Sequence, residues 1–307
     1  MLISVLALVL NLLPTADAAA CVCARNVALP GTGVIRPWAG VFAFDYGIKL
    51  EGDPALWEGF SVVDLHGDSM AGMYMPPMLV QTASVSATLG LPAQFSVSTT
   101  LPYMYKDNLG ESEMIGDTDL ASFNDVDLTL NWAHESKDKT AWFGAAAGPT
   151  FPTGTVIENS PVRSGRGTFG ANLVVKGGGK LKPKVAVAAQ ATGSFGFGAD
   201  AGGYVVAPSA SLVAGVKFST RENGKLDIAV LGIERWSGKD RQDALVYKNS
   251  GYLVTDLAVA MSYTFWASKL RSAGFSVRAQ APLVQTVGDP MYAENFGASA
   301  GLNVVAF

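Results

Sequence analysis

The residues best suited to specific chemistry lie in one short stretch, residues 66–78. The stretch holds one imidazole and four thioethers, at His66, Met70, Met73, Met75 and Met78. Imidazole and thioether groups favour Cu(I) over hard cations, whereas methionine also fills irregular apolar gaps. Three readings therefore stay open: a Cu(I) site, a packed loop constriction and a site for an apolar ligand. Because Pro76 and Pro77 limit how the last sulfur can converge with the others, we expect the constriction.

Catalytic patterns are weak in this chain. It has only two histidines, His66 and His134, and lacks the serine motif of a nucleophile elbow. The run Gly177–Gly179 does not stand between a strand and a helix, so it offers no phosphate-binding loop. We therefore expect neither an enzyme nor a resident cofactor.

Charged and amide side chains recur at alternate positions along several segments, which would place them on one face of extended strands. The candidates for lining a solute path are Asp45, Lys49, Lys106, Asp125, Asp127, Asn131, Lys176, Gln190, Lys217, Asp256, Arg278 and Gln280. Acids and bases nearly balance. Two readings stay open: a hydrated channel for small polar solutes, or a salt-bridged plug through which nothing passes.

The elements that must position these residues are strands. From Asp125 to Glu135, apolar Val126, Leu128, Leu130 and Trp132 alternate with polar residues, which is typical of a strand with one apolar face. Similar alternation predicts twelve strands, at residues 36–50, 78–90, 93–106, 123–136, 139–152, 165–178, 182–196, 203–219, 225–238, 250–266, 270–286 and 294–307. The predicted class is all-β.

The length and linkage of these segments favour a transmembrane barrel. Each is long enough for the roughly 9–11 tilted residues that cross a bilayer. Short connections alternate with longer ones, as in outer-membrane barrels. We therefore predict an antiparallel up-and-down barrel of about 12 strands, with 10 or 14 as alternatives, and both termini in the periplasm. A soluble β-sandwich is the rival fold, but its strands would be shorter.

Composition supports the same class. The 307 residues are 49% hydrophobic and only 16% charged, and the mean hydropathy is +0.25. No uninterrupted apolar run is long enough for a transmembrane helix. The net charge of −4, with no cluster of Lys and Arg, argues against a nucleic-acid partner.

The two ends of the chain carry export signals. Residues 1–20 combine a short apolar run with small residues, which predicts a cleaved signal peptide, with a membrane anchor as the alternative. Cys21 follows directly and could be lipidated. Residues 21–35 would form a periplasmic segment before a barrel at 36–307 in outer-membrane lipid. A strand ending on Phe307 is typical of sequences recognised by the bacterial barrel-insertion machinery.

Several short motifs resemble a known family. They are Gly116-Asp117, the strand Asn124–Leu130, the turn Gly90-Leu91-Pro92 with Leu101-Pro102, and the segment Gly148–Gly154. On these motifs the chain resembles the outer-membrane transporter barrels of the meta-pathway phenol-degradation (MetA-like) family. The resemblance implies a barrel that moves small molecules, aromatic or hydrophobic ones included, across the outer membrane of a Gram-negative bacterium.

Overall fold

The computed structural model describes residues 37–52, 62–66, 78–108, 120–138, 140–156, 164–220, 226–242, 245–246, 251–267, 272–288 and 293–306. Within these residues, twelve long strands form one closed wall. They are β1 (Gly40–Gly52), β3 (Met78–Gly90), β4 (Phe95–Asn108), β6 (Val126–Glu135), β7 (Ala141–Phe151), β8 (Gly170–Lys182), β9 (Val185–Gly196), β11 (Ser209–Ser219), β12 (Leu226–Ser237), β15 (Tyr252–Ala267), β16 (Ser272–Gly288) and β17 (Ala293–Ala306).

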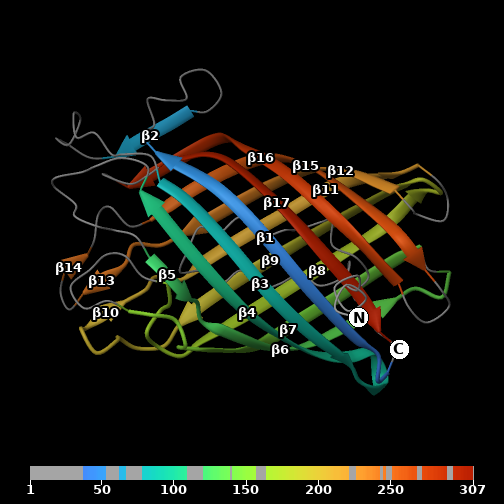
Figure 1. The fold of residues 1–307 in the computed structure, drawn as a ribbon, viewed down its shortest axis with the longest axis horizontal. Coiled ribbons are helices and arrows are strands. Elements are labelled where there is room, and N and C mark those ends of the chain that lie inside the picture. Colours follow the sequence, from blue (N-terminus) through green and yellow to red (C-terminus); the bar gives the residue numbers. More distant parts are fainter. Residues whose placement is uncertain are drawn as a thin grey trace.

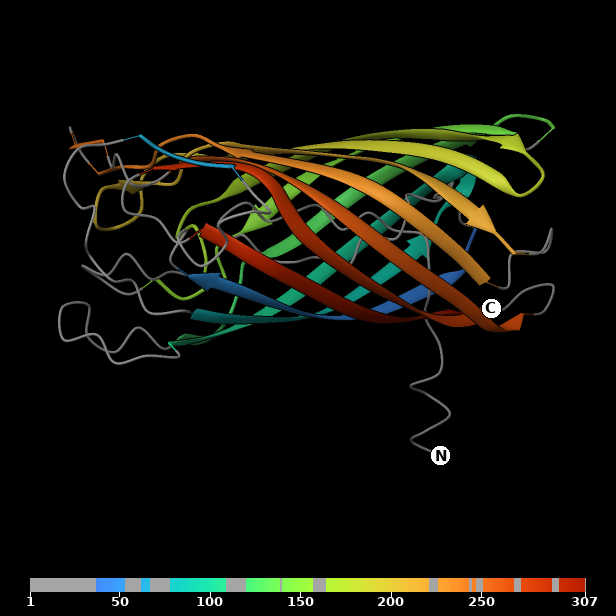
Figure 2. The same ribbon diagram turned by 90° about the horizontal axis from the view of Figure 1, so that it is seen from above.

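Each long strand pairs antiparallel with the long strands before and after it in the chain. The wall closes where β1 pairs with β17, in a register that joins Gly40 to Ala306. The strands cross the barrel obliquely, as a closed sheet requires (Figures 1 and 2). The prediction of an all-β, twelve-stranded, antiparallel barrel is confirmed.

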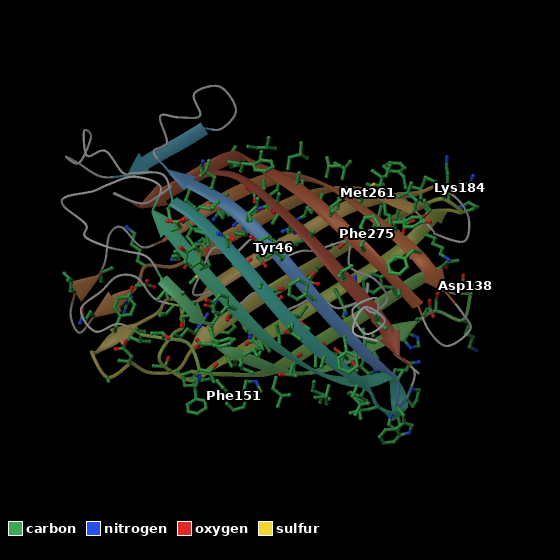
Figure 3. All side chains as sticks on the ribbon, viewed as in Figure 1. Tyr46, Asp138, Phe151, Lys184, Met261 and Phe275 are labelled. Carbon is green, nitrogen blue, oxygen red and sulfur yellow. The ribbon has the colours of Figure 1, made fainter. Side chains whose placement is uncertain are left out.

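The two ends of the barrel differ. Five pairs of long strands are joined by short connections, at residues 91–94, 136–140, 183–184, 220–225 and 268–271. The strand ends that these connections join lie at what we call the turn end, where β1 begins and β17 ends. The longer connections lie at the opposite, loop end; Asp138 and Lys184 mark the turn end in Figure 3. The strand pattern predicts one of these longer connections at residues 287–293, but only residues 289–292 separate β16 from β17.

Alternation of the side chains gives the barrel an apolar outside. In β6, Leu128 and Leu130 are 38% and 50% exposed, whereas Asp127 and Asn131 are only 3% and 4% exposed. Exposed aromatic and aliphatic side chains continue around the wall, including Tyr46 and Phe151 (Figure 3). Because the wall is a single sheet, the buried set must face the barrel interior. We call this side the inner face.

Short additional strands lie at the loop end. β2 (Val62–His66) pairs in parallel with β16, and β5 (Leu120–Phe123) pairs with β4. β10 (Tyr204–Val205), β13 (Arg241–Gln242) and β14 (Leu245–Val246) form a separate small sheet (Figure 1).

Some predicted strand limits were wrong. β8 occupies 170–182 instead of 165–178, because glycines obscure the alternation while Pro183 sets the actual turn. β11 begins at Ser209 instead of residue 203, since residues 204–205 belong to the small sheet. β1 begins at Gly40, just after Trp38, whose φ of 67° takes the chain out of the extended region.

Several expectations fall outside the described residues. They are the signal peptide at 1–20, the segment 21–35 with Cys21, and the terminal Phe307. Among the described residues, none belongs to a helix long and apolar enough to span a membrane.

Candidate functional site: the polar inner face

The candidate solute-path residues are placed by the strand alternation. Asp125, Asp127, Asn131, Lys49, Lys176, Gln190, Asp256, Arg278 and Gln280 are buried, while Asp45, Lys106 and Lys217 are half-buried. All occupy inner-face positions, except that Asp125 stands at the junction of β5 and β6. They come from eight of the twelve long strands, so the structure spreads them around the interior and does not gather them in one cluster.

Part of the β7–β8 connection crosses the inner face near the loop end. The Asp125 carboxylate accepts hydrogen bonds from the backbone N–H groups of Gly154 (3.0 Å) and Arg166 (2.7 Å). The Arg166 guanidinium then donates to the Ser194 hydroxyl on β9 at 2.8 Å. Since β7 and β8 lie between these anchors, the segment spans two strands across the interior.

Glycine is required where this segment meets Asp125. A Cβ atom on Gly165 would lie 2.4 Å from Asp125 Oδ1 and 2.7 Å from the Gly154 Cα. No side chain fits at those distances. We call residues 152–156 and 164–169 the inward segment.

A second hydrogen-bonded group lies beneath the inward segment. Asp127 Oδ1 accepts from the Thr150 hydroxyl at 2.7 Å and from the Asn172 amide at 2.6 Å. The same amide also reaches Thr150 Oγ1 at 2.8 Å. Three neighbouring strands therefore hold this carboxylate in place, which stabilises the charge in a buried position.

Ion pairs cover other parts of the inner face. Arg235 pairs with Asp256, whose Oδ2 also accepts from the Gln280 amide at 3.1 Å. Lys49 pairs with Glu51 at 2.8 Å, and both are buried. Near the turn end, Lys217 pairs with Asp227 at 2.9 Å.

Lys176 differs from these bases. It is 2% exposed, on the inner face of β8, yet none of the hydrogen bonds or ion pairs within the described part of the chain involves it. Its cross-strand neighbour on β9 is Gln190. The Gln190 amide nitrogen donates to Thr192, while its Oε1 has no hydrogen-bond partner among the residues that the structure describes.

The inner face also has apolar patches. One extends over β11, β12 and β15 and consists of Val213, Ala229, Leu231, Ile233, Ala258 and Ala260. A smaller patch at the loop end joins Met78 and Val80 with Met104 and Leu120. The inner face therefore carries apolar patches between its polar groups.

Of the suggested copper ligands, the structure places two. Met78 packs in the apolar loop-end patch, and His66 ends β2 opposite Gly288. Met70, Met73 and Met75 lie outside the described residues. Within the residues described, no group of three or more His, Cys, Asp or Glu side chains is arranged to hold a metal ion.

Sequence reasoning missed several inner-face residues. Arg166 was assigned to a strand, so its crossing to Ser194 was not foreseen. Arg235 and Glu51 were not selected either, although each forms an ion pair with a residue that was. The flanking glycines in Ser164-Gly165-Arg166-Gly167 were the available signal for a tight non-strand path.

Comparison with known proteins places the fold. No protein-family model matches the chain, and no curated protein matches it in sequence. Its structure is similar to a COG4313 outer membrane channel from Pseudomonas putida F1, with a TM-score of 0.73 and 14% identity over 92% of this chain and 100% of that one.

Two further solved structures are less similar. The KdgM porin has a TM-score of 0.44 and 8% identity, covering 86% of this chain and 99% of that one. The translocator domain of the autotransporter NalP from Neisseria meningitidis has a TM-score of 0.47 and 12% identity, covering 90% and 91%. The similarity to the COG4313 channel shows that this chain has the fold of a Gram-negative outer-membrane β-barrel.

Proposed function

We propose that this chain is a passive outer-membrane channel for small solutes and not an enzyme. The observation that carries the proposal is the polar inner face, where charged and amide side chains from most of the wall are buried inside a closed barrel with an apolar outside. A base facing lipid near the midplane would cost about 2–4 kcal/mol, so this arrangement fits a membrane barrel with a polar interior.

Two similarities support the proposal. A barrel of the same fold is an outer membrane channel in Pseudomonas putida F1. The motifs near Gly90, Asn124 and Gly148 resemble the MetA-like transporter family, and membership of that family would make aromatic or hydrophobic molecules candidate solutes.

The proposed orientation places the turn end in the periplasm. Outer-membrane barrels have short periplasmic turns and longer external loops, which matches the two ends of this barrel. Both chain termini would then be periplasmic, after export directed by residues 1–20 and insertion directed by the strand that precedes Phe307. The inward segment would narrow the external half of the channel, and Cys21 would be a lipidation site.

Conductance of the purified full chain in planar bilayers tests the proposal. We expect discrete current steps in potassium chloride, and liposome swelling with small sugars, amino acids or aromatic acids would then rank the solutes. Absence of current at every voltage, from protein shown to be folded and inserted, would overturn the channel proposal.

A non-conducting barrel is the second candidate. The observation that favours it is the near-complete burial of inner-face side chains such as Asn172 and Leu231, both 0% exposed. In that case the ion pairs and hydrogen bonds would stabilise a plug. A surface protein that binds copper through residues 66–78 belongs to this candidate.

A further inference from the structure

The region around Lys176 combines one buried cation with unusually small neighbours. Facing it on β7 is Gly144, where an added Cβ atom would lie 3.0 Å from the Lys176 Cε. The lysine side chain therefore lies over Gly144, in space that any other residue would fill. Glycine at this position makes room for the lysine.

An aromatic ring occupies a second such space, one step toward the turn end. Trp142 pairs with Gly178, and a Cβ atom on that glycine would lie 2.9 Å from the indole Cζ2. Trp142 is half-buried and lies on the same inner face as Lys176. An apolar surface thus lies beside the cation.

The remaining inner-face neighbours of Lys176, among the described residues, carry no negative charge. The inner-face positions around Lys176 on β7, β8 and β9 are occupied by Trp142, Gly144, Ala146, Val174, Gly178, Ala188, Gln190 and Thr192. Glu135 lies one strand further away, beside Trp142. A buried ammonium without a carboxylate is unfavourable, and the other buried lysine described above, Lys49, does pair with one. The geometry therefore leaves a place for an external anion.

We propose that Lys176, Gln190 and Trp142 form a subsite for a monocarboxylate with an apolar body the size of a benzene ring. The ammonium of Lys176 binds the carboxylate, while the ring of Trp142, with Ala146 and Val174 nearby, contacts the apolar body. The inference rests on the proposed channel function and names its substrate class.

Reversal potentials in planar bilayers test the subsite. Benzoate, acetate and chloride are compared as potassium salts, with uptake of neutral benzamide into liposomes alongside. In the wild type, benzoate should permeate at least as well as the smaller acetate. Lys176→Met keeps a long side chain without charge and should lower the benzoate-to-potassium permeability ratio about tenfold. This is the fold-change expected when one hydrogen bond to a charged group is lost, at the weak end of the range for such bonds. Benzamide uptake should not change.

Two variants on the outer side serve as matched controls. Lys182 is exposed at the end of β8, where a register shift pairs it with Val185 on the outer side, and Trp132 stands on the outer face of β6. Lys182→Met and Trp132→Leu should leave the ratios unchanged, whereas Trp142→Leu should lower the benzoate-to-acetate ratio about threefold, within the range expected for lost aromatic contacts. Equal ratios in wild type and Lys176→Met would overturn the subsite.

Equilibrium dialysis separates failure of the subsite from failure of the channel. Radiolabelled benzoate is dialysed against the detergent-solubilised full chain. Lys176-dependent binding without any current would refute the channel and retain the subsite. Current without Lys176-dependent binding or selectivity would refute the subsite and retain the channel.

Discussion

At the scale of single residues, Asp138 shows how hydrogen bonds within a turn stabilise an ionised carboxylate. Its carboxylate accepts hydrogen bonds from the hydroxyls of Ser136 (2.6 Å) and Thr140 (2.7 Å) and from the Thr140 N–H (3.2 Å). These bonds, Ser136 first, lower the pKa of Asp138 from 3.8 to about 2. Because the pKa is lower in the folded chain than in the unfolded one, the turn is stabilised above about pH 4 and loses this contribution as the pH falls toward 2.

The titration of Asp138 can therefore be shifted by its neighbour. Ser136→Ala removes the strongest of these bonds, so we expect the pKa of Asp138 to rise toward 3.8, whereas Ser136→Thr keeps a hydroxyl and should preserve the low value. The carboxyl carbon shift of Asp138, followed by NMR between pH 1.5 and 5, measures both. An unchanged midpoint in Ser136→Ala would contradict the assignment.

Gly165 offers a second test at this scale. Alanine there would place Cβ against Asp125 and Gly154, so we expect Gly165→Ala to destabilise the docked inward segment by about 1–3 kcal/mol. In the proposed channel, single-channel conductance should rise. Gly202→Ala is the matched control, because a Cβ atom there would meet only an Asp200 oxygen, at the ordinary contact distance of 3.4 Å. Equal conductance in the wild type, Gly165→Ala and Gly202→Ala would show that the inward segment does not limit the current.

At the scale of strands, β6 gives the sharpest test of register. Asp127 is buried and Leu128 is exposed on the outside. We expect a cysteine at 127 to react with a water-soluble maleimide in the membrane-embedded protein and a cysteine at 128 to react only with a lipid-soluble reagent. The reverse labelling pattern would show that the assignment of faces along β6 is wrong by one residue.

Predictability differed from strand to strand for a physical reason. The sequence limits of β3 were predicted at 78–90, as observed, because polar and apolar residues alternate from Thr82 to Leu89. β8 was displaced because Gly177, Gly178 and Gly179 carry no side chain to mark a face. Periodicity identifies strands only where both faces have distinguishable side chains.

The inner-face site was less predictable than the fold. Residues such as Asp127 and Lys176 could be predicted, because the alternation of apolar and polar residues assigns them to the inner face. Their partners could not, since Arg166 reaches Ser194 through a non-strand segment and Arg235 meets Asp256 only after two strands pair. Such contacts depend on the register between paired strands, which cannot be predicted from the alternation within a single strand.

At the scale of the whole molecule, polar and apolar groups are unevenly spread over the inner face. The inward segment and the carboxylates of Asp125 and Asp127 lie over β6, β7, β8 and β9, whereas an apolar patch covers β11, β12 and β15 between the Lys217–Asp227 and Arg235–Asp256 ion pairs. A solute with one charged end and one apolar side could contact polar and apolar parts of the wall at once. A purely polar solute would have favourable contacts on only part of the wall.

The seam between β1 and β17 has a consequence for biogenesis. The first and last long strands are hydrogen-bonded neighbours, so the wall stays open until the final strand has been synthesised. Until then, β1 and β16 each present an unpaired edge, which readily pairs with other chains. Pairing between such distant segments is also slow. A chain of this design therefore needs protection of both edges until the wall closes, and closure follows the synthesis of its last strand.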